Sequence, residues 1–116
     1  MNHIQSPAPD TDATIEAEII RKGKTAPRVM PADLDDAVVG EQYHVFDGSQ
    51  LTVCCLTLRN GFTVTGESAC ASPENFDAGI GKRIARENAK QKIWPLLGFA
   101  LRERLYQMTQ PAQAPQ

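Results

Sequence analysis

An Asn-Gly dipeptide, Asn60-Gly61, lies between two runs of β-branched and apolar residues near the middle of the chain. The first run is LTVCCLTL at 51–58, and the second is FTVT at 62–65. Asn-Gly between two such runs is the strongest short-range signal for a β-hairpin, because a type I′ turn needs positive φ at both central residues. The sequence therefore predicts two antiparallel strands whose two-residue turn brings Cys54 opposite Glu67.

The strand at 51–58 carries apolar side chains on both faces, whereas the strand after the turn is more polar. We therefore expect the first strand to lie inside a small sheet and the second to lie at its edge. A third strand is predicted at 43–46, where the sequence YHVF precedes an Asp-Gly turn.

Helices are predicted before and after these strands in the sequence. Isoleucines at helical spacing indicate a short helix that ends at Gly23, and Pro31 suits the first position of a second helix that ends at Gly40. A longer helix is expected from about 73 to about 106, with a kink or break at Pro95. Its early apolar stripe is formed by Phe76, Ile80 and Ile84. Its later stripe is formed by Trp94, Leu97, Leu101, Leu105 and Met108.

These elements make one α+β domain of two short helices, a small antiparallel sheet and a long C-terminal helix. A chain of 116 residues has the length of a single domain. We expect the folded body at 13–108 and disordered tails at 1–12 and 109–116, because both ends are polar and proline-rich. No apolar run is long enough to span a bilayer, and the first residues do not resemble a signal peptide.

The three cysteines are too few for a disulfide-stapled secreted domain. Cys54 and Cys55 are adjacent in a predicted strand, so they point to opposite faces and cannot hold one metal ion together. We expect both to be small core residues. Cys70 precedes a helix N-terminus, where the pKa of a thiol can be lowered, and is a candidate reactive residue.

No catalytic constellation stands out. The sequence has no nucleophile elbow, no phosphate-binding loop and no histidine in an obvious position to act as a base. Glu67 has two interpretations, a buried carboxylate with a raised pKa or a hydrogen-bond acceptor for a backbone amide at the start of the long helix. We expect no catalytic residue, no metal and no cofactor.

Charge is unevenly distributed along the chain. Twelve basic and 14 acidic side chains give a net charge of −2, but residues 81–104 carry seven basic and two acidic side chains, or +5, and the remainder carries −7. Four basic residues on one broad helix face form a candidate anion-binding stripe for nucleic acid, a nucleotide or an acidic protein. The stripe is Lys82, Arg83, Arg86 and Lys90. The alternative is a solvated face that is partly neutralised by Asp33, Asp35 and Asp36.

Two further partners are considered. A small anionic ligand such as a nucleotide signal would lie between the hairpin and the basic helix. Its candidate ligand-binding residues are Arg59, Asn60, Thr65, Glu67, Arg83, Arg86 and Asn88. The later apolar stripe exceeds what a three-stranded sheet can cover, which predicts a homodimer or higher oligomer. The candidate interface residues are Trp94, Leu97, Leu101 and Leu105.

The segment LTVCCLTLRNGFTVTGESACASPENFD at 51–77 resembles the signature of a family of small phage and prophage proteins named after two genes of enterobacterial phages. The resemblance continues through GKRIARENAK at 81–90 and KIWPLLGF at 92–99. It implies an accessory protein that acts inside the bacterial cell, and it implies no reaction or cofactor. We therefore expect a non-enzymatic, cytoplasmic protein that binds a host macromolecule, in the first place a host protein, and interferes with a host process such as defence.

Overall fold

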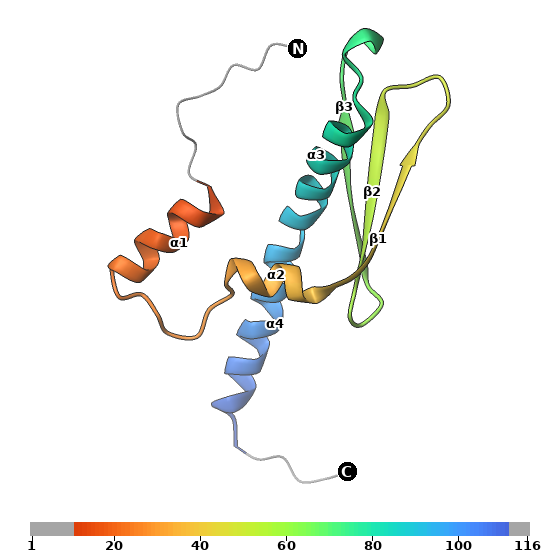
Figure 1. Cartoon of the computed structure of the whole chain (residues 1–116). Helices are drawn as coiled ribbons and strands as arrows, with labels where there is room; N and C mark the ends of the chain where they lie inside the picture. The colour runs from red at the N-terminus through yellow and green to blue at the C-terminus, as the bar shows by residue number, and fades with distance from the viewer. Residues whose placement is uncertain (1–10, 112–116) are drawn as a thin grey trace, which may run out of the picture.

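The computed structural model describes residues 11–111 and confirms the predicted α+β fold (Figure 1). Its helices are α1 (Asp12–Arg21), α2 (Pro31–Ala37), α3 (Ala78–Gln91) and α4 (Ile93–Met108). Its strands are β1 (Val38–Val45), β2 (Leu51–Leu58) and β3 (Thr63–Ala69), and a 3-10 turn, η1 (Pro73–Asn75), precedes α3. Most of the two predicted tails, at 1–10 and 112–116, lies outside the described residues.

The three strands form one antiparallel sheet in the order β1-β2-β3, so the central and edge positions of β2 and β3 are as predicted. α3 lies along one face of the sheet, and no helix in residues 11–111 covers the other face (Figure 1). The side chains of β2 alternate accordingly. Those under α3 are buried, whereas those on the open face are half-buried.

α3 lies close to the sheet because small residues meet at the contact. Gly66 of β3 faces Ala85 and Ala89, and a Cβ at position 66 would overlap with backbone atoms of both. Gly81 lies over Thr52, whose Oγ1 would be 2.9 Å from a Cβ at position 81. The helix therefore packs through its narrow side of glycine and alanine.

The hydrophobic core lies between α3, the covered face of the sheet and α2. Its buried apolar residues are Leu34, Ala37, Cys54, Leu56, Leu58, Val64, Ala85, Ala89 and Ile93. Several of these are small, while the large side chains of Phe46, Phe62 and Phe99 are exposed. The chain thus keeps much of its bulky apolar surface outside its own core.

The hairpin forms where the sequence predicts it, but its loop is one residue longer. The Gly61 N–H donates to the Leu58 carbonyl at 2.9 Å, and the Leu58 N–H donates to the Phe62 carbonyl at 2.8 Å. Gly61 has a φ of +89°, which matches a type I turn closed by a left-handed glycine. The predicted two-residue turn is therefore wrong, and so is the register derived from it.

The corrected register moves Glu67 away from Cys54. Cys54 lies opposite Gly66, whereas Glu67 lies opposite Val53 on the open face, where the Glu67 side chain is exposed. Interpreting Glu67 as a buried carboxylate is therefore wrong. Cys54 and Cys55 do point to opposite faces, because Cys54 is buried under α3 and Cys55 is half-buried on the open face.

The second helix is shorter than predicted. α2 ends at Ala37 instead of Gly40, because the chain passes directly into β1 at the β-branched residues Val38 and Val39. Gly40 lies within β1, next to an irregularity in its pairing with β2. Tight coupling of α2 to β1 holds the acidic helix beside the sheet.

The long helix begins later than predicted. Residues 73–75 form the separate turn η1, and α3 begins at Ala78. Asp77 caps α3, since its Oδ1 accepts the Ile80 N–H at 2.9 Å. Ser72, which precedes η1, makes no such bond with its side chain.

The predicted interruption of the long helix falls at Lys92, between α3 and α4. Pro95 has no N–H to donate to the carbonyl of Gln91, which is the last residue of α3. The Lys92 N–H bonds the Ala89 carbonyl at 3.1 Å, as in a 3-10 turn. α4 then continues in nearly the same direction and extends past the sheet (Figure 1).

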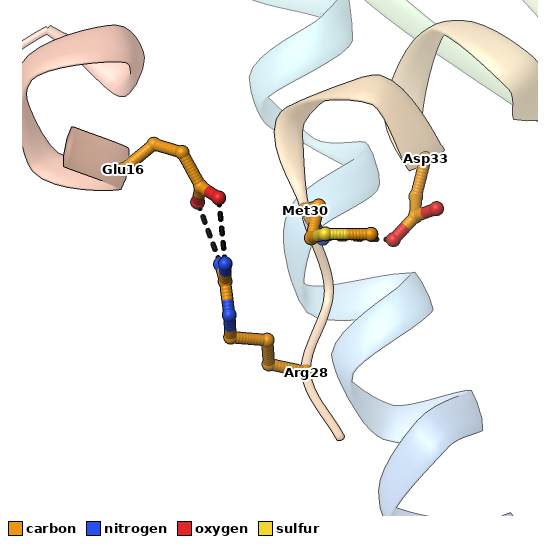
Figure 2. Close-up of polar contacts among 4 residues, drawn as sticks. All are labelled: Glu16, Arg28, Met30 and Asp33. Atoms are coloured by element: carbon orange, nitrogen blue, oxygen red, sulfur yellow. Dashed lines mark hydrogen bonds and ion pairs between the residues drawn. The ribbon is translucent and has the colours of Figure 1, made fainter. Parts of the chain in front are cut away.

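Few side chains join α1 to the rest of the fold, and none of its residues is buried. Arg28 donates from both terminal nitrogens to the two carboxylate oxygens of Glu16, each at 2.6 Å (Figure 2). This hydrogen-bonded pair lowers the pKa of the Glu16 carboxyl. In the same region Asp33 accepts the Met30 N–H at 2.8 Å, which fixes the start of α2 (Figure 2).

Candidate binding site

A pocket of about 550 Å³ opens between the end of β3, the loop at 70–77 and α3. Its apolar lining consists of Ala69, Cys70, Phe76, Ile80, Gly81 and Ile84. Its polar lining consists of Gln50, Glu67, Ser68, Asn75, Asp77 and Asn88. A concave, largely apolar site with a few polar groups is the usual form of a ligand-binding pocket.

The early apolar stripe of the helical region lines this pocket instead of packing on the sheet. Ile80 and Ile84 keep 46% and 37% of their surface exposed. They do so because Gly81 and Ala85, on the neighbouring side of α3, occupy the contact with the sheet. Exposed large apolar residues with a polar rim are typical of an interaction site.

Two hydrogen bonds fix the walls of the pocket. Asp77 holds the first turn of α3 through the Ile80 N–H, and Asn88 donates from Nδ2 to the Glu67 carbonyl at 2.8 Å. The second bond joins α3 directly to the edge strand. A wall made from a helix and a strand that are bonded to each other gives the pocket a defined shape.

The pocket continues into the free edge of β3. In an antiparallel strand, backbone N–H and C=O groups point alternately toward and away from the neighbouring strand. The bond between Leu58 and Phe62 sets this alternation, so Thr65 and Glu67 direct their backbone groups away from β2. The Asn88 bond to the Glu67 carbonyl agrees with this direction.

The pocket has one acidic side chain on the α3 side. Asp77 is the charged residue of the lining on the α3 side, because the Glu67 side chain lies on the open face of the sheet while its backbone carbonyl binds Asn88. Cys70 also lies in the lining, and its Sγ donates to the Ser72 carbonyl at 3.4 Å. The pocket therefore suits an apolar group that carries or adjoins a positive charge.

The predicted basic stripe lies on the other flank of α3, toward β1 and α2. Arg86 Nε binds Glu41 Oε2 at 2.8 Å, and Lys90 Nζ binds Asp35 Oδ1 at 2.9 Å. The hydrogen bond from Arg86 also lowers the pKa of the Glu41 carboxyl. The ion pair of Lys90 with α2 is the contact expected for a face that the acidic helix partly neutralises.

A third stripe residue has an aromatic neighbour. Lys82 Nζ lies 5.5 Å from the ring centre of Tyr43, within the range of a cation–π contact. Burial, together with the nearby groups of Cys54 and Glu41, raises the pKa of Tyr43 to about 12. Arg83 is exposed on the outer side of α3, and no ion pair involves it within residues 11–111.

The candidate ligand-binding residues are not brought into one cavity. Glu67 and Asn88 line the pocket beside β3, but Arg86 points to the opposite flank of α3. Arg59 and Asn60 lie in the hairpin turn, where the Asn60 Oδ1 accepts the Phe62 N–H at 3.0 Å. Thr65 lies on the open face of the sheet, and Arg83 faces solvent. Sequence reasoning missed Phe76, Ile80 and Asp77 as site residues, although the early apolar stripe was the available signal.

The candidate interface residues all lie along α4. Trp94 and Leu97 pack partly against the core, and Leu101 and Leu105 are half-buried. Met108, at the end of the stripe, is 73% exposed. Half of the stripe thus extends beyond the sheet.

None of the helices in residues 11–111 is both long enough and apolar enough to span a membrane. Within the same residues, no three histidine, cysteine, aspartate or glutamate side chains are grouped so as to hold a metal ion. Burial raises the pKa of the Cys54 thiol, and all three cysteines are unbridged.

Together these features describe a small α+β protein with a half-covered sheet, a pocket at one strand edge and a projecting C-terminal helix. A model of the phage protein (N4 Gp49/phage Sf6 gene 66) family matches residues 29–105, and the chain belongs to this family. The matched region includes α2, the whole sheet, the pocket and most of α4. No curated protein and no solved structure matches the chain.

Proposed function

We propose that this phage-family protein is a non-enzymatic accessory protein that binds a host protein inside the bacterial cell. Its pocket beside β3 receives an extended segment of that host protein. The observation that carries the proposal is the continuity of an apolar pocket with a free strand edge. An added strand gains main-chain hydrogen bonds from Thr65, while one of its side chains fills the space against Ile80 and Ile84.

The charge of the pocket indicates which side chains the bound host segment carries. Asp77 favours a sequence in which a large apolar residue adjoins lysine or arginine. The strand edge contributes affinity for any extended backbone, and the pocket contributes the choice of side chain. Occupying an interaction segment of a host protein is a simple route by which a phage protein interferes with a host process such as defence.

The polar groups of the pocket support binding rather than catalysis. Ser68 and Cys70 are the nucleophilic side chains in its lining, and no histidine lines it to act as a base. His44 lies on the open face of the sheet, edge-on to Phe46 with ring centres 4.4 Å apart. The His44 ring therefore packs against the ring of Phe46.

Selection of peptides from a random displayed library tests this proposal directly. We expect enriched peptides to share an apolar residue next to a basic one. Ile84→Asp should weaken their binding at least about tenfold, because it places a charge in the apolar wall. Ile20→Asp, at an exposed isoleucine of α1, is the matched control and should leave binding unchanged. Failure to enrich peptides, or equal binding by both variants, contradicts the proposal.

The nucleic-acid and small-anion alternatives have distinct signatures. Binding of DNA or RNA through the basic face predicts an affinity that falls steeply with added salt. Binding of a nucleotide predicts a rise of the thermal midpoint, because the ligand stabilises the folded chain alone. Either result with wild type, lost on Arg83→Glu and kept on Ile84→Asp, would favour the alternative over the peptide pocket.

A further inference from the structure

α4 extends beyond the core and leaves large apolar side chains outside it. Ile93 is the buried residue of α4, whereas Phe99 and Met108 are each 73% exposed. A helix of 16 residues is close to the length at which isolated helices are only marginally stable in water. Contact with another molecule would therefore stabilise the projecting half of α4.

The spacing of the apolar residues in the α4 stripe is symmetric about its centre. Leu101 lies at its centre, Leu97 and Leu105 lie four residues to either side, and Trp94 and Met108 lie seven residues to either side. Residues separated by four and seven positions share one face of a helix. A two-fold interface needs such a self-complementary surface, because both subunits use the same patch.

We propose that α4 pairs with α4 of a second copy of this chain in an antiparallel orientation, with the two-fold axis at Leu101. Leu101 then contacts Leu101 of the second copy. Leu97 contacts Leu105, and Trp94 contacts Met108. Each large side chain meets another, and the exposed end of one helix covers the half-buried start of the other. This pairing does not depend on the pocket beside β3.

A groove beside the stripe contains Arg104, whose place on α4 favours the antiparallel orientation. It has a volume of about 310 Å³ and lies between α2, the hairpin turn and α4. Its charged residues are Asp33 and Asp36 of α2 together with Arg28, Arg59 and Arg104, and Arg28 is already paired with Glu16. Antiparallel pairing with the axis at Leu101 brings Arg104 of the second copy level with Gly98, which carries no charge. Parallel pairing would place Arg104 level with Arg104, where like charges repel.

The size of the contact indicates a weak dimer. Trp94, Leu97, Leu101 and Leu105 are already half-buried within one chain, so the ten stripe side chains of two copies bury less than about 1,000 Å², the lower limit for a standard specific interface. We therefore expect the pair to form at micromolar chain concentrations. Leu105→Glu places a charge in the stripe and should give the 12.7 kDa mass of one chain by light scattering. Phe99→Glu, on the opposite side of α4, should keep the wild-type mass of two chains.

Cysteine cross-linking tests the orientation. In a Cys55→Ser, Cys70→Ser background the remaining thiol, Cys54, is fully buried. Leu101→Cys should then form a disulfide between copies under mild oxidation, because the two residues meet on the axis. Met108→Cys should not, since 14 residues along α4 separate the two sites by about 21 Å. Cross-linking at 108, or at neither position, overturns the proposal, as does a monomeric wild type at tens of micromolar. Circular dichroism confirms that each variant is folded.

Discussion

Gly66 sets the distance between the sheet and α3, and replacing it with alanine tests that contact. The new Cβ would overlap with backbone atoms of Ala85 and Ala89, which can move only if the whole helix moves. We expect Gly66→Ala to lower the free energy of unfolding by about 3 kcal/mol, at the upper end of the effects of overpacking. Urea denaturation at a fixed chain concentration measures the change.

Gly98→Ala is the matched control for this substitution. Gly98 lies within α4, and a Cβ there would have no atom within 4 Å. Alanine is the better helix former, so this variant should raise the free energy of unfolding by about 0.5–1 kcal/mol. Two alanine variants with the same stability would contradict the close packing at Gly66.

The phenol of Tyr43 provides a test of burial by pH. Its pKa is about 12, well above the value of about 10 for an exposed tyrosine, mainly because it is removed from solvent. A pKa raised on folding contributes stability that is present below pH 10 and is lost as the pH rises toward 12. In Tyr106→Phe, Tyr43 is the remaining tyrosine. At pH 10.5, absorbance at 295 nm should show little tyrosinate in the folded chain and mostly tyrosinate in urea. Equal ionisation in both would contradict the burial of this ring.

At the scale of elements, α1 is held mainly by the ion pair of Glu16 with Arg28, beside a longer hydrogen bond from Gln91 Nε2 to Asp12 Oδ2 at 3.4 Å. Glu16→Gln removes the charge that Arg28 binds and should release α1 (Figure 2). Because the pKa of Glu16 is lowered in the folded chain, the pair is complete above its usual pKa of 4.5 and is lost as the pH falls through the lowered value. Hydrogen exchange should therefore become fast in α1 of the variant, and also in α1 of wild type under acid conditions. Exchange in the sheet should stay slow in both cases.

Glu18→Gln controls for the loss of a carboxylate from α1. Glu18 pairs with Arg21 and Lys22 inside the same helix, so it does not hold α1 to the rest of the fold. Hydrogen exchange in α1 of Glu18→Gln should stay close to that of wild type at neutral pH. Unchanged α1 protection in Glu16→Gln would show that other contacts hold the helix.

The elements that the sequence predicts best are those with strong local signals. Asn60-Gly61 identifies the hairpin, and Pro95 identifies the break in the long helix. The hairpin register was missed because the Asn60 side chain and Gly61 together close a three-residue loop, which the dipeptide alone does not distinguish from a two-residue turn. Because the loop is one residue longer, Glu67 lies on the open face of the sheet and not on the predicted face with Cys54.

Helical periodicity identifies the stripe that lines the pocket, but it does not show that this stripe stays off the sheet. Two stripes in α3 share the same spacing, one with Ile80 and Ile84 and one with Gly81 and Ala85. Hydrophobicity favours the isoleucines for the core, but Gly66 in β3 leaves room only for the smaller stripe. The choice is made by a contact between segments far apart in the sequence, so it appears only in the folded chain.

At the scale of the whole molecule, the chain is elongated. Its Cα radius of gyration is 18.5 Å, whereas a compact domain of this length has a radius of about 13 Å. The projection of α4 beyond the sheet contributes to this extension (Figure 1). An elongated chain with a small core exposes surface that a second copy can cover, so assembly and folding should be linked.

That linkage predicts a stability that depends on concentration. If α4 pairs as proposed, unfolding separates two chains, and each tenfold rise in chain concentration should raise the apparent free energy of unfolding by about 1.4 kcal/mol per dimer. Urea denaturation of wild type over a hundredfold range of concentration measures this effect. Leu105→Glu should unfold at one midpoint throughout, because its stripe cannot pair. A wild-type midpoint that is equally constant would mean that each chain folds alone and that α4 keeps its apolar stripe for a different partner.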